Sequence, residues 1–443
     1  MRNAFRLPVA LAAVALAAAL TGCSTPETPF VPREVAASAP IDPAQPCVRQ
    51  SDLASQVQRT GEPAEPSGVK ATLSGGVIRV TGGENVTLTA LSKAVGGSAL
   101  RQTAPGEWLL AADLEVLPGA SIRVAAPEVK WLKLRSTAGS FVAVKVLGGG
   151  LHLEGTCVTS WDPDSSTAVP EPGKGRSYLL ARDGGQLTVD WSELRFLGHG
   201  AVESYGLSWR TAGTTGHIAH SVVSHLYFGL YSYEIDGLKV TDNEFHNNQL
   251  YGVDPHTGSR RLVIERNVVH DNGKHGIILA EDCVDSVIRD NVVYRNAHHG
   301  IVLYQRSDRN TIENNETFRN AAQGINVNES ADNVVRGNKV YENTESGIGI
   351  SQTSARNVVE NNEIRSNGQD GVRLVSEATD NQVRGNTIGR NARYGVYIDG
   401  DGLFDVSDNV IFGSKIGVLT KNTDQEPGGN EMRDNLDGDL LAR

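Results

Sequence analysis

Three side chains that can move protons stand within six residues of one another. Tyr251, Asp254 and His256 lie in the stretch Tyr-Gly-Val-Asp-Pro-His. An imidazole is neutral yet basic near neutral pH, because its unperturbed pKa is about 6.5. A phenol can donate a proton, and a carboxylate can accept or orient one. This combination favours general acid–base chemistry, with His256 as the base, Tyr251 as the donor and Asp254 as an orienting or hydrogen-bonding group.

Further titratable and aromatic residues surround this stretch. Tyr251, His275 and His299 each stand directly before a glycine, which predicts a ladder of side chains. Plain stacking is an equal interpretation of this ladder, and solvated charges are a simpler interpretation of Lys274 and Arg306. The residues that we expect to bind a substrate are Tyr233, Lys274, His275, Glu281, His299, Tyr304 and Arg306.

A repeat must position these side chains. A glycine followed by apolar residues recurs from Gly229 to Gly417 at intervals of 22 to 24 residues. Two asparagine series run in step with it, namely Asn248, Asn272, Asn296, Asn320, Asn343, Asn367 and Asn391, and Asn243, Asn267, Asn291, Asn315, Asn338, Asn362, Asn386 and Asn409. Asparagines at equivalent turns can bond from coil to coil across the ~4.8 Å between adjacent strands. The repeat therefore predicts an all-β fold, a right-handed parallel β-helix.

Strand alternation then places the chemistry on the outside. The residue after each glycine is β-branched and apolar, as in Val253 and Ile277, and we expect it to point inward. The residues two and four positions after Gly252 then point outward on one face, and these are Asp254 and His256.

The chain divides into five expected segments. These are a lipoprotein signal peptide over residues 1–22, a flexible tether over 23–66, an N-terminal β segment capping the helix over 67–130, the β-helix over 131–420 and a tail over 421–443. Residues 20–23, Leu-Thr-Gly-Cys, resemble a bacterial lipobox. That resemblance implies lipidation of Cys23 and an extracytoplasmic protein, anchored to the outer face of the cell membrane or periplasmic.

Cysteines and charge narrow the function further. Of the three cysteines other than Cys23, Cys283 lies inside the repeats and is expected to be buried, which leaves a Cys47–Cys157 disulfide as an open possibility. No cysteine or histidine cluster has zinc spacing, so we expect no metal site. The net charge of −11 argues against nucleic acid as a partner. A polyanionic ligand would need a local basic patch.

The motif resembles a known family. Tyr251 to His256 is similar to the Tyr-Gly-x-Asp-Pro-His signature of the mannuronan C5-epimerases, especially the periplasmic type, and the similarity covers roughly residues 105–400. The resemblance implies conversion of β-D-mannuronate to α-L-guluronate in an alginate-like polysaccharide by a monomer. His256 and Tyr251 would hold the acid and base positions and Asp254 that of the motif aspartate. No cofactor is expected, and a calcium requirement stays open.

Two positions depart from the family pattern. Thr257 stands where the periplasmic type has a second aspartate, and Glu281 stands where that type has an arginine for the substrate carboxylate. An acidic residue near Glu281 is instead similar to the calcium-dependent secreted branch. Neutralisation of the carboxylate would then fall to Arg306, Lys274 or a protonated His275.

The reaction explains the need for these groups, and other interpretations remain. Inversion at C5 removes a proton next to a carboxylate and returns one to the opposite face, which requires a base, a donor and charge neutralisation. β-Elimination by a lyase starts with the same step. A non-catalytic glycan-binding β-helix is a third interpretation. A glycoside hydrolase would need a carboxylate pair, such as Asp254 with Glu281 or Asp282, and would leave the histidine and tyrosine without a role.

Overall fold

The computed structural model describes residues 32–36, 39–57, 67–423 and 425–442. The signal peptide and the lipidation at Cys23 lie outside these residues. Residues Met1–Ala39 and Pro40–Arg443 are two separate units, and the described residues of the first carry no helix or strand. Within the described part of the chain, no helix combines the length and the apolar character that crossing a bilayer would require.

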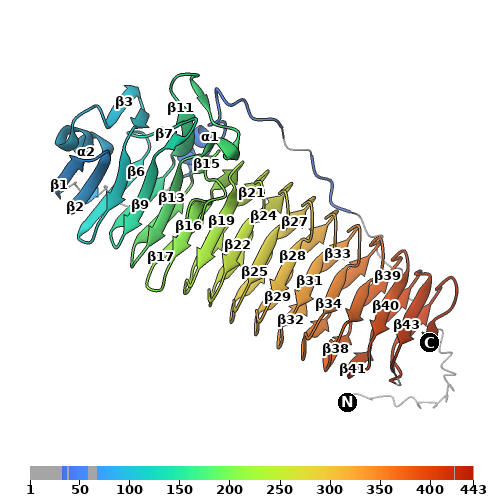
Figure 1. Ribbon diagram of the computed structural model, residues 1–443. Helices are drawn as coiled ribbons and strands as arrows, with labels where there is room; N and C mark the ends of the chain where they lie inside the picture. Colours follow the sequence, from blue (N-terminus) through green and yellow to red (C-terminus); the bar gives the residue numbers. More distant parts are fainter. Residues whose placement is uncertain (1–31, 37–38, 58–66, 424, 443) are drawn as a thin grey trace, which may run out of the picture. The chain divides into compact units, whose positions relative to one another are not determined.

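Pro40–Arg443 is a stack of coils (Figure 1). A typical coil has three short strands, such as β22 (Val253–His256), β23 (Val263–Glu265) and β24 (Val268–His270). Each strand pairs in parallel with the equivalent strand of the next coil, so that three parallel sheets, A, B and C, run along the stack. This is the all-β parallel β-helix that the repeat predicts.

The strands of each sheet follow one another in chain order. Sheet A contains β2 (Val77–Val86), β5 (Asp113–Val116), β9 (Ala143–Leu147), β13 (Tyr178–Arg182), β16 (Gly206–Arg210), β19 (Phe228–Tyr233), β22, β25 (Ile277–Ala280), β28 (Ile301–Tyr304), β31 (Ile325–Asn328), β34 (Ile348–Ser351), β37 (Val372–Val375), β40 (Tyr394–Asp399), β43 (Ile416–Lys421) and β45 (Leu440–Ala442). Sheet B shares β2 and continues through β6 (Ala120–Ala125), β10 (Gly150–Glu154), β14 (Gln186–Asp190), β17 (Thr215–Ala219), β20 (Lys239–Thr241), β23, β26 (Val287–Arg289), β29 (Thr311–Glu313), β32 (Val334–Arg336), β35 (Val358–Glu360), β38 (Asn381–Arg384) and β41 (Phe404–Ser407). Sheet C contains β4 (Glu107–Leu110), β7 (Trp131–Thr137), β11 (Cys157–Asp162), β15 (Glu193–Arg195), β18 (Val222–Ser224), β21 (Glu244–His246), β24, β27 (Val292–Tyr294), β30 (Glu316–Phe318), β33 (Lys339–Tyr341), β36 (Glu363–Arg365), β39 (Thr387–Gly389), β42 (Val410–Phe412) and β44 (Glu431–Arg433).

Antiparallel strands and helices occur mainly near the N-terminal end. They are α1 (Gln50–Gln56), β1 (Ser67–Ser74), α2 (Leu88–Val95), β3 (Leu100–Ala104), β8 (Ser140–Phe141), β12 (Thr167–Ala168) and the 3₁₀ helix η1 (Pro172–Lys174). β1 pairs antiparallel with β2, and α2 lies at the same end of the stack (Figure 1).

The asparagine series form the expected ladders. In one, the Asn272 side-chain amide donates to Oδ1 of Asn296 at 2.9 Å, and Asn296 donates to Asn320 at 3.0 Å. The same Oδ1 atoms also accept the backbone N–H of the asparagine one coil earlier. Each buried amide is therefore satisfied by the neighbouring coils, which avoids the cost of an unpaired buried polar group.

The core and the glycines explain the period. The residues that follow the repeat glycines are completely buried, among them Val253, Ile277 and Ile301. At Gly276, an added Cβ would lie 2.5 Å from Val293 Cγ1 and 2.7 Å from the carbonyl oxygen of Gly300 in the next coil. Glycine is needed there because the chain passes too close to its neighbours for any side chain.

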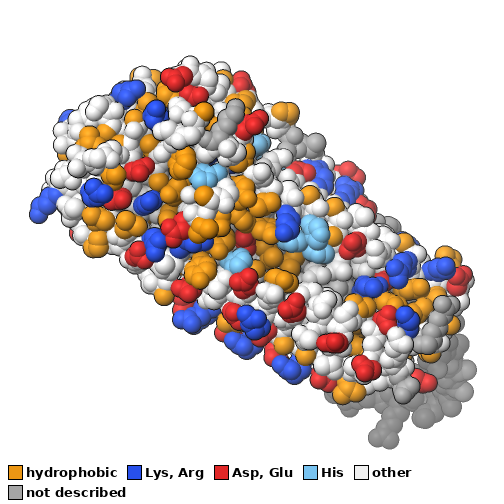
Figure 2. Space-filling model, viewed as in Figure 1, with side chains coloured by type: hydrophobic (Ala, Val, Ile, Leu, Met, Phe, Trp, Pro, Cys, Tyr) orange, Lys and Arg blue, Asp and Glu red, His pale blue; other side chains and the backbone are white. Residues whose placement is uncertain are grey.

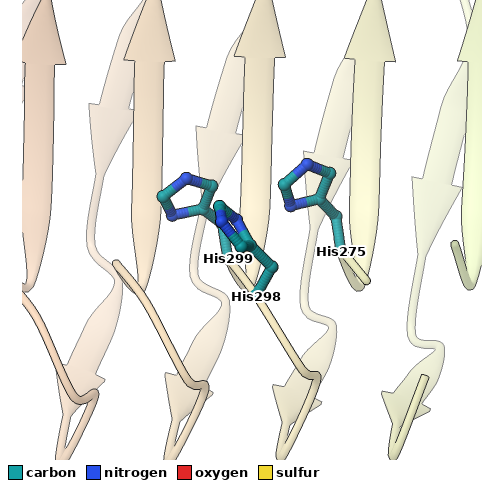
Figure 3. A group of neighbouring side chains, drawn as sticks. All are labelled: His275, His298 and His299. Carbon is teal, nitrogen blue, oxygen red and sulfur yellow. The ribbon is translucent and has the colours of Figure 1, made fainter. Parts of the chain in front are cut away.

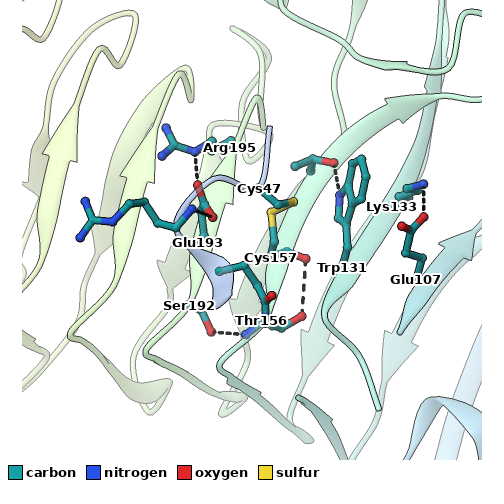
Figure 4. Close-up of a disulfide and its surroundings, with 12 residues drawn as sticks. Cys47, Glu107, Trp131, Lys133, Thr156, Cys157, Ser192, Glu193 and Arg195 are labelled. Atoms are coloured by element: carbon teal, nitrogen blue, oxygen red, sulfur yellow. Dashed lines mark hydrogen bonds and ion pairs between the residues drawn. A yellow bond between two sulfur atoms is a disulfide. The ribbon is translucent and has the colours of Figure 1, made fainter. Parts of the chain in front are cut away.

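Part of the range that the sequence predicts to be a tether is folded. Cys47 forms a disulfide with Cys157 of β11 (Figure 4). The Gln50 amide of α1 donates to the carbonyl of Gly155 at 2.6 Å. The backbone N–H of Arg49 donates to Glu193. The possible disulfide is thus present, and Cys283 is the free, buried cysteine among the described residues.

Candidate active site

The motif residues lie on the outer face of sheet A. Parallel pairing aligns Arg210 with Tyr233, Tyr233 with His256, and Tyr231 with Asp254. Two outward columns therefore cross β22, one through Asp254 and one through His256. Tyr251 stands two residues before β22, so the three motif side chains span one strand.

A groove opens over these columns. Its volume is about 430 Å³, and Figure 2 shows histidines clustered on this face beside apolar surface. The lining residues are Tyr251, Asp254, His256, Lys274, His275, Ile278, Ala280, His298, His299, Val302, Tyr304, Asn326 and Asn328.

His256 is a half-buried imidazole with a fixed orientation. Its Nδ1 lies 2.7 Å from the Thr257 hydroxyl, and that hydroxyl donates to Glu281 at 2.9 Å. With the hydroxyl hydrogen directed to Glu281, the Thr257 oxygen accepts a hydrogen bond from Nδ1–H, and the lone pair of the neutral ring is on Nε2. The alternative tautomer accepts the Thr257 backbone N–H at 3.0 Å. Burial, against the opposing charge of Glu281, lowers the pKa of His256 below 6.5, so the ring is neutral at pH 7.

Asp254 lies at the bottom of the groove and is only 1% exposed. Neither of its carboxyl oxygens has a hydrogen-bond partner in the structure. Burial raises its pKa well above the usual value, although the charge of Lys274 opposes the shift. Burial thus favours the protonated form of this side chain, a carboxylic acid that can donate a hydrogen bond. It does not orient His256 as one sequence-based interpretation expected, because Thr257 and Glu281 occupy that place.

Tyr251 and Lys274 form the other side of the groove. The Lys274 ammonium donates to the Tyr251 hydroxyl at 2.8 Å. A cation at this distance stabilises a phenolate, and it also provides positive charge at the groove wall. Of the three groups that the sequence proposes for neutralising a carboxylate, Lys274 is the one that lines the groove as a cation.

The other two candidates do not fill that role. Arg306 is outside the groove lining and forms a two-pronged ion pair with Asp282, with distances of 2.7 and 2.8 Å. Burial and neighbouring histidines lower the pKa of His275 to about 2. The prediction that a protonated His275 neutralises the substrate carboxylate is therefore wrong at neutral pH.

The predicted ladder is present as a stack. The rings of Tyr251 and His275 lie 5.3 Å apart, and those of His275 and His299 lie 5.2 Å apart, nearly parallel in both pairs. His298, which sequence reasoning missed, packs edge-on against His275 (Figure 3).

These histidines form a cluster that spacing along the chain does not predict. Ring nitrogens of His275, His298 and His299 lie within 4.8 Å of one another. The cluster arises because His275 stacks directly on the next coil. Three neutral imidazoles can hold zinc or a similar ion. However, Nδ1 of His299 accepts a hydrogen bond from the Gln323 N–H at 3.1 Å, so the neutral ring carries its proton on Nε2. Coordination of a metal through Nε2 would move that proton to Nδ1 and break the hydrogen bond with Gln323.

The remaining predicted residues differ in whether they line the groove. Tyr304 lines the groove. Tyr233 lies next to His256 in its column but does not line the groove, and the Arg210 guanidinium lies 5.3 Å from its ring centre. Glu281 contacts Thr257 and does not line the groove. Arg210 was missed by sequence reasoning, because it lies two coils before the motif.

The fold and the site together define the class of protein, which is a parallel β-helix with a polar groove across one sheet. The family described as "Right handed beta helix region" matches residues 185–329 and 303–436, more than half of the chain. The chain belongs to this family, and the handedness expected from the repeat is confirmed.

Two curated relatives match part of the chain. The mannuronan C5-epimerase of Pseudomonas aeruginosa is 32% identical over 201 residues, which cover 42% of this chain and 36% of that protein. Mannuronan C5-epimerase AlgG of Azotobacter vinelandii is 29% identical over 201 residues, covering 42% and 38%. The match thus spans little more than a third of the length of these relatives.

A solved structure shares the architecture. The crystal structure of the periplasmic alginate epimerase AlgG superimposes with a TM-score of 0.66 and 21% identity, over 92% of this chain and 100% of that one. At this identity the likeness shows the fold.

Proposed function

We propose that this chain inverts C5 of β-D-mannuronate residues in an alginate-like polysaccharide and produces α-L-guluronate. The observation that carries the proposal is the arrangement on one coil of an imidazole, a buried carboxyl group and a phenol around one groove. The named activity of the two curated relatives supports the same reaction.

His256 takes the proton from C5. The C5–H bond breaks, its electron pair moves toward the sugar carboxylate, and the proton goes to Nε2. Thr257, held by Glu281, stabilises the tautomer that has its lone pair on Nε2.

Asp254 and Lys274 stabilise the doubly charged intermediate. A carboxylic acid kept neutral by burial is an effective donor to a developing oxyanion. The Asp254 O–H and the Lys274 ammonium both reach the groove and contribute the hydrogen bond and positive charge that the carboxylate needs.

Tyr251 returns a proton to the opposite face. A sugar lying across β22 would have the Tyr251 column on one side and the His256 column on the other. The phenol O–H gives its proton to C5, and Lys274, 2.8 Å from the hydroxyl, stabilises the phenolate. Solvent then restores the proton on Tyr251 and removes the one on His256.

The setting of the reaction is part of the proposal. We propose an extracytoplasmic monomer, lipid-anchored through Cys23, that uses no organic cofactor. Replacement of Cys23 by alanine should move the protein from the membrane fraction to the soluble fraction; unchanged fractionation would contradict the anchor.

The test is NMR of defined polymannuronate incubated with the purified protein, with EDTA in one sample and calcium in the other. We expect guluronate signals in the sample with calcium, and their presence or absence in the EDTA sample decides whether the reaction needs calcium. Appearance of an unsaturated sugar with ultraviolet absorbance would instead show a lyase. Binding with no change in the polymer would show a glycan-binding protein.

A further inference from the structure

The floor of the groove continues along sheet A far beyond the motif. Pairing registers extend the Asp254 column through the next coils to Ile278, Val302, Asn326, Gly349, Arg373 and Tyr397. The His256 column continues through Ala280, Tyr304, Asn328 and Ser351. Neither column contains a carboxylate between the motif and Arg373.

The charges nearby lie outside this floor. Glu281 and Glu329 stand directly after β25 and β31, where the chain leaves sheet A, and Glu345 stands before β34. In a chain of net charge −11, a floor without carboxylates over several coils is a path that a polyanion can follow.

The path ends at a cluster of two arginines and two tyrosines, Arg373, Arg393, Tyr394 and Tyr397. The Arg373 guanidinium lies 4.7 Å from the ring centre of Tyr397, and that of Arg393 lies 4.9 Å from the ring centre of Tyr394. The two tyrosine rings are 5.5 Å apart. Figure 2 shows basic and apolar side chains together near the C-terminal end of the face that carries the histidines.

One buried carboxylate holds the arginines in place. Asp370 is completely buried, 3.1 Å from Arg373 and 3.4 Å from Arg393. Their side chains remain 28% and 42% exposed, and two cations facing one carboxylate leave positive charge for a ligand.

We infer that Arg373, Arg393, Tyr394 and Tyr397 form a distal subsite that binds the acidic polysaccharide several sugars away from the reacting residue. This inference rests on the proposed function for the identity of the polymer. Arginine pairs with carboxylates through two parallel hydrogen bonds, and tyrosine rings present flat apolar surface to a sugar face.

The spacing sets a length threshold. Arg373 is five coils from Asp254, or roughly 24 Å at the strand spacing of ~4.8 Å. A 1,4-linked sugar advances the chain by about the same distance as one coil. A chain must therefore have about six sugars to contact both sites.

The experiment compares oligomannuronates of different length on the His256→Asn protein, in which turnover does not change the ligand. Calorimetry should show tighter binding of a decamer than of a tetramer. Adding Arg393→Gln, and separately Arg373→Gln, should weaken decamer binding about tenfold or more and leave tetramer binding unchanged.

The matched control is Arg384→Gln on sheet B, an exposed arginine paired with Glu360, which should change neither affinity. Arg373→Gln could fail to fold because Arg373 is the less exposed partner of Asp370. Arg393 is more exposed, so Arg393→Gln should keep the fold in that case. Equal affinities of the Arg393 variant and its parent for the decamer would overturn the subsite. If no oligomannuronate binds the His256→Asn protein but oligomers of another acidic sugar show the length effect, the proposed substrate is refuted and the subsite is retained.

Discussion

At the scale of single residues, the site depends on how burial sets proton affinity. His256 and Asp254 stand two residues apart, and burial lowers the pKa of the first and raises that of the second. Burial therefore favours the neutral form of both groups, a base in His256 and a hydrogen-bond donor in Asp254, in one groove. Residue types and spacing predict these two and Tyr251. They do not predict the contact of Thr257 with Glu281, because it joins adjacent coils, nor the complete burial of Asp254.

Glu281 should act through His256. The base works when neutral, so kcat/KM falls as pH drops through its lowered pKa, with a midpoint below 6.5. Glu281 raises that pKa, so Glu281→Gln should move the acid limb to still lower pH and reduce kcat about 10- to 100-fold, as loss of an orienting partner does. A pH–rate profile measures both effects. Glu313→Gln, on sheet B, should leave the profile unchanged; an unshifted limb in Glu281→Gln would contradict the relay.

Asp254 should lower the stability of the folded protein and support its activity. Its folded pKa lies above the unfolded value near 3.8, so its carboxyl group favours the folded state less as pH rises from that value toward the folded pKa. The amide in Asp254→Asn does not titrate, so the melting temperature of this variant relative to the natural protein should be higher at pH 7 than at pH 4. Activity should fall at the same time. A difference in melting temperature that does not depend on pH would show that folding does not raise the pKa of Asp254.

At the scale of elements, the coil is the unit that the sequence specifies best. Glycine spacing and the asparagine series predict the coils and their ladders, because each position repeats the same close contact. The segment around α1 is harder to predict. Its composition is that of a linker, and it is held by contacts with Cys157, Gly155 and Glu193, more than 100 residues away.

The ladder should carry measurable stability. Asn296→Ala removes the acceptor of the Asn272 backbone N–H and of one N–H of the Asn272 side-chain amide. Each buried polar group left unpaired costs about 1–3 kcal/mol, so we expect at least ~2 kcal/mol of destabilisation in chemical denaturation. Lys239→Ala, at an exposed position of β20, should stay within ~0.5 kcal/mol. A similarly small effect of Asn296→Ala would mean that water replaces the ladder bonds.

At the scale of the whole molecule, the fold explains how a protein of negative net charge can offer a binding path to the acidic polymer that we propose. The net charge is −11, yet the groove face has Lys274 at one end of a floor without carboxylates and Arg373 with Arg393 at the other. Net charge alone predicts repulsion. The local arrangement appears only when the coils are stacked, because these residues are about 100 positions apart in the chain.

The incorporation of solvent deuterium at C5 tests the central claim most directly. Polymannuronate is incubated with the protein in heavy water, and the product is analysed by NMR. The natural protein should place deuterium at C5 of every inverted residue, whereas His256→Asn should keep its fold and lose at least ~10²-fold of the incorporation rate. Near-normal incorporation by a folded His256→Asn protein would show that another group is the base, and guluronate without deuterium would contradict exchange through the proposed acid and base.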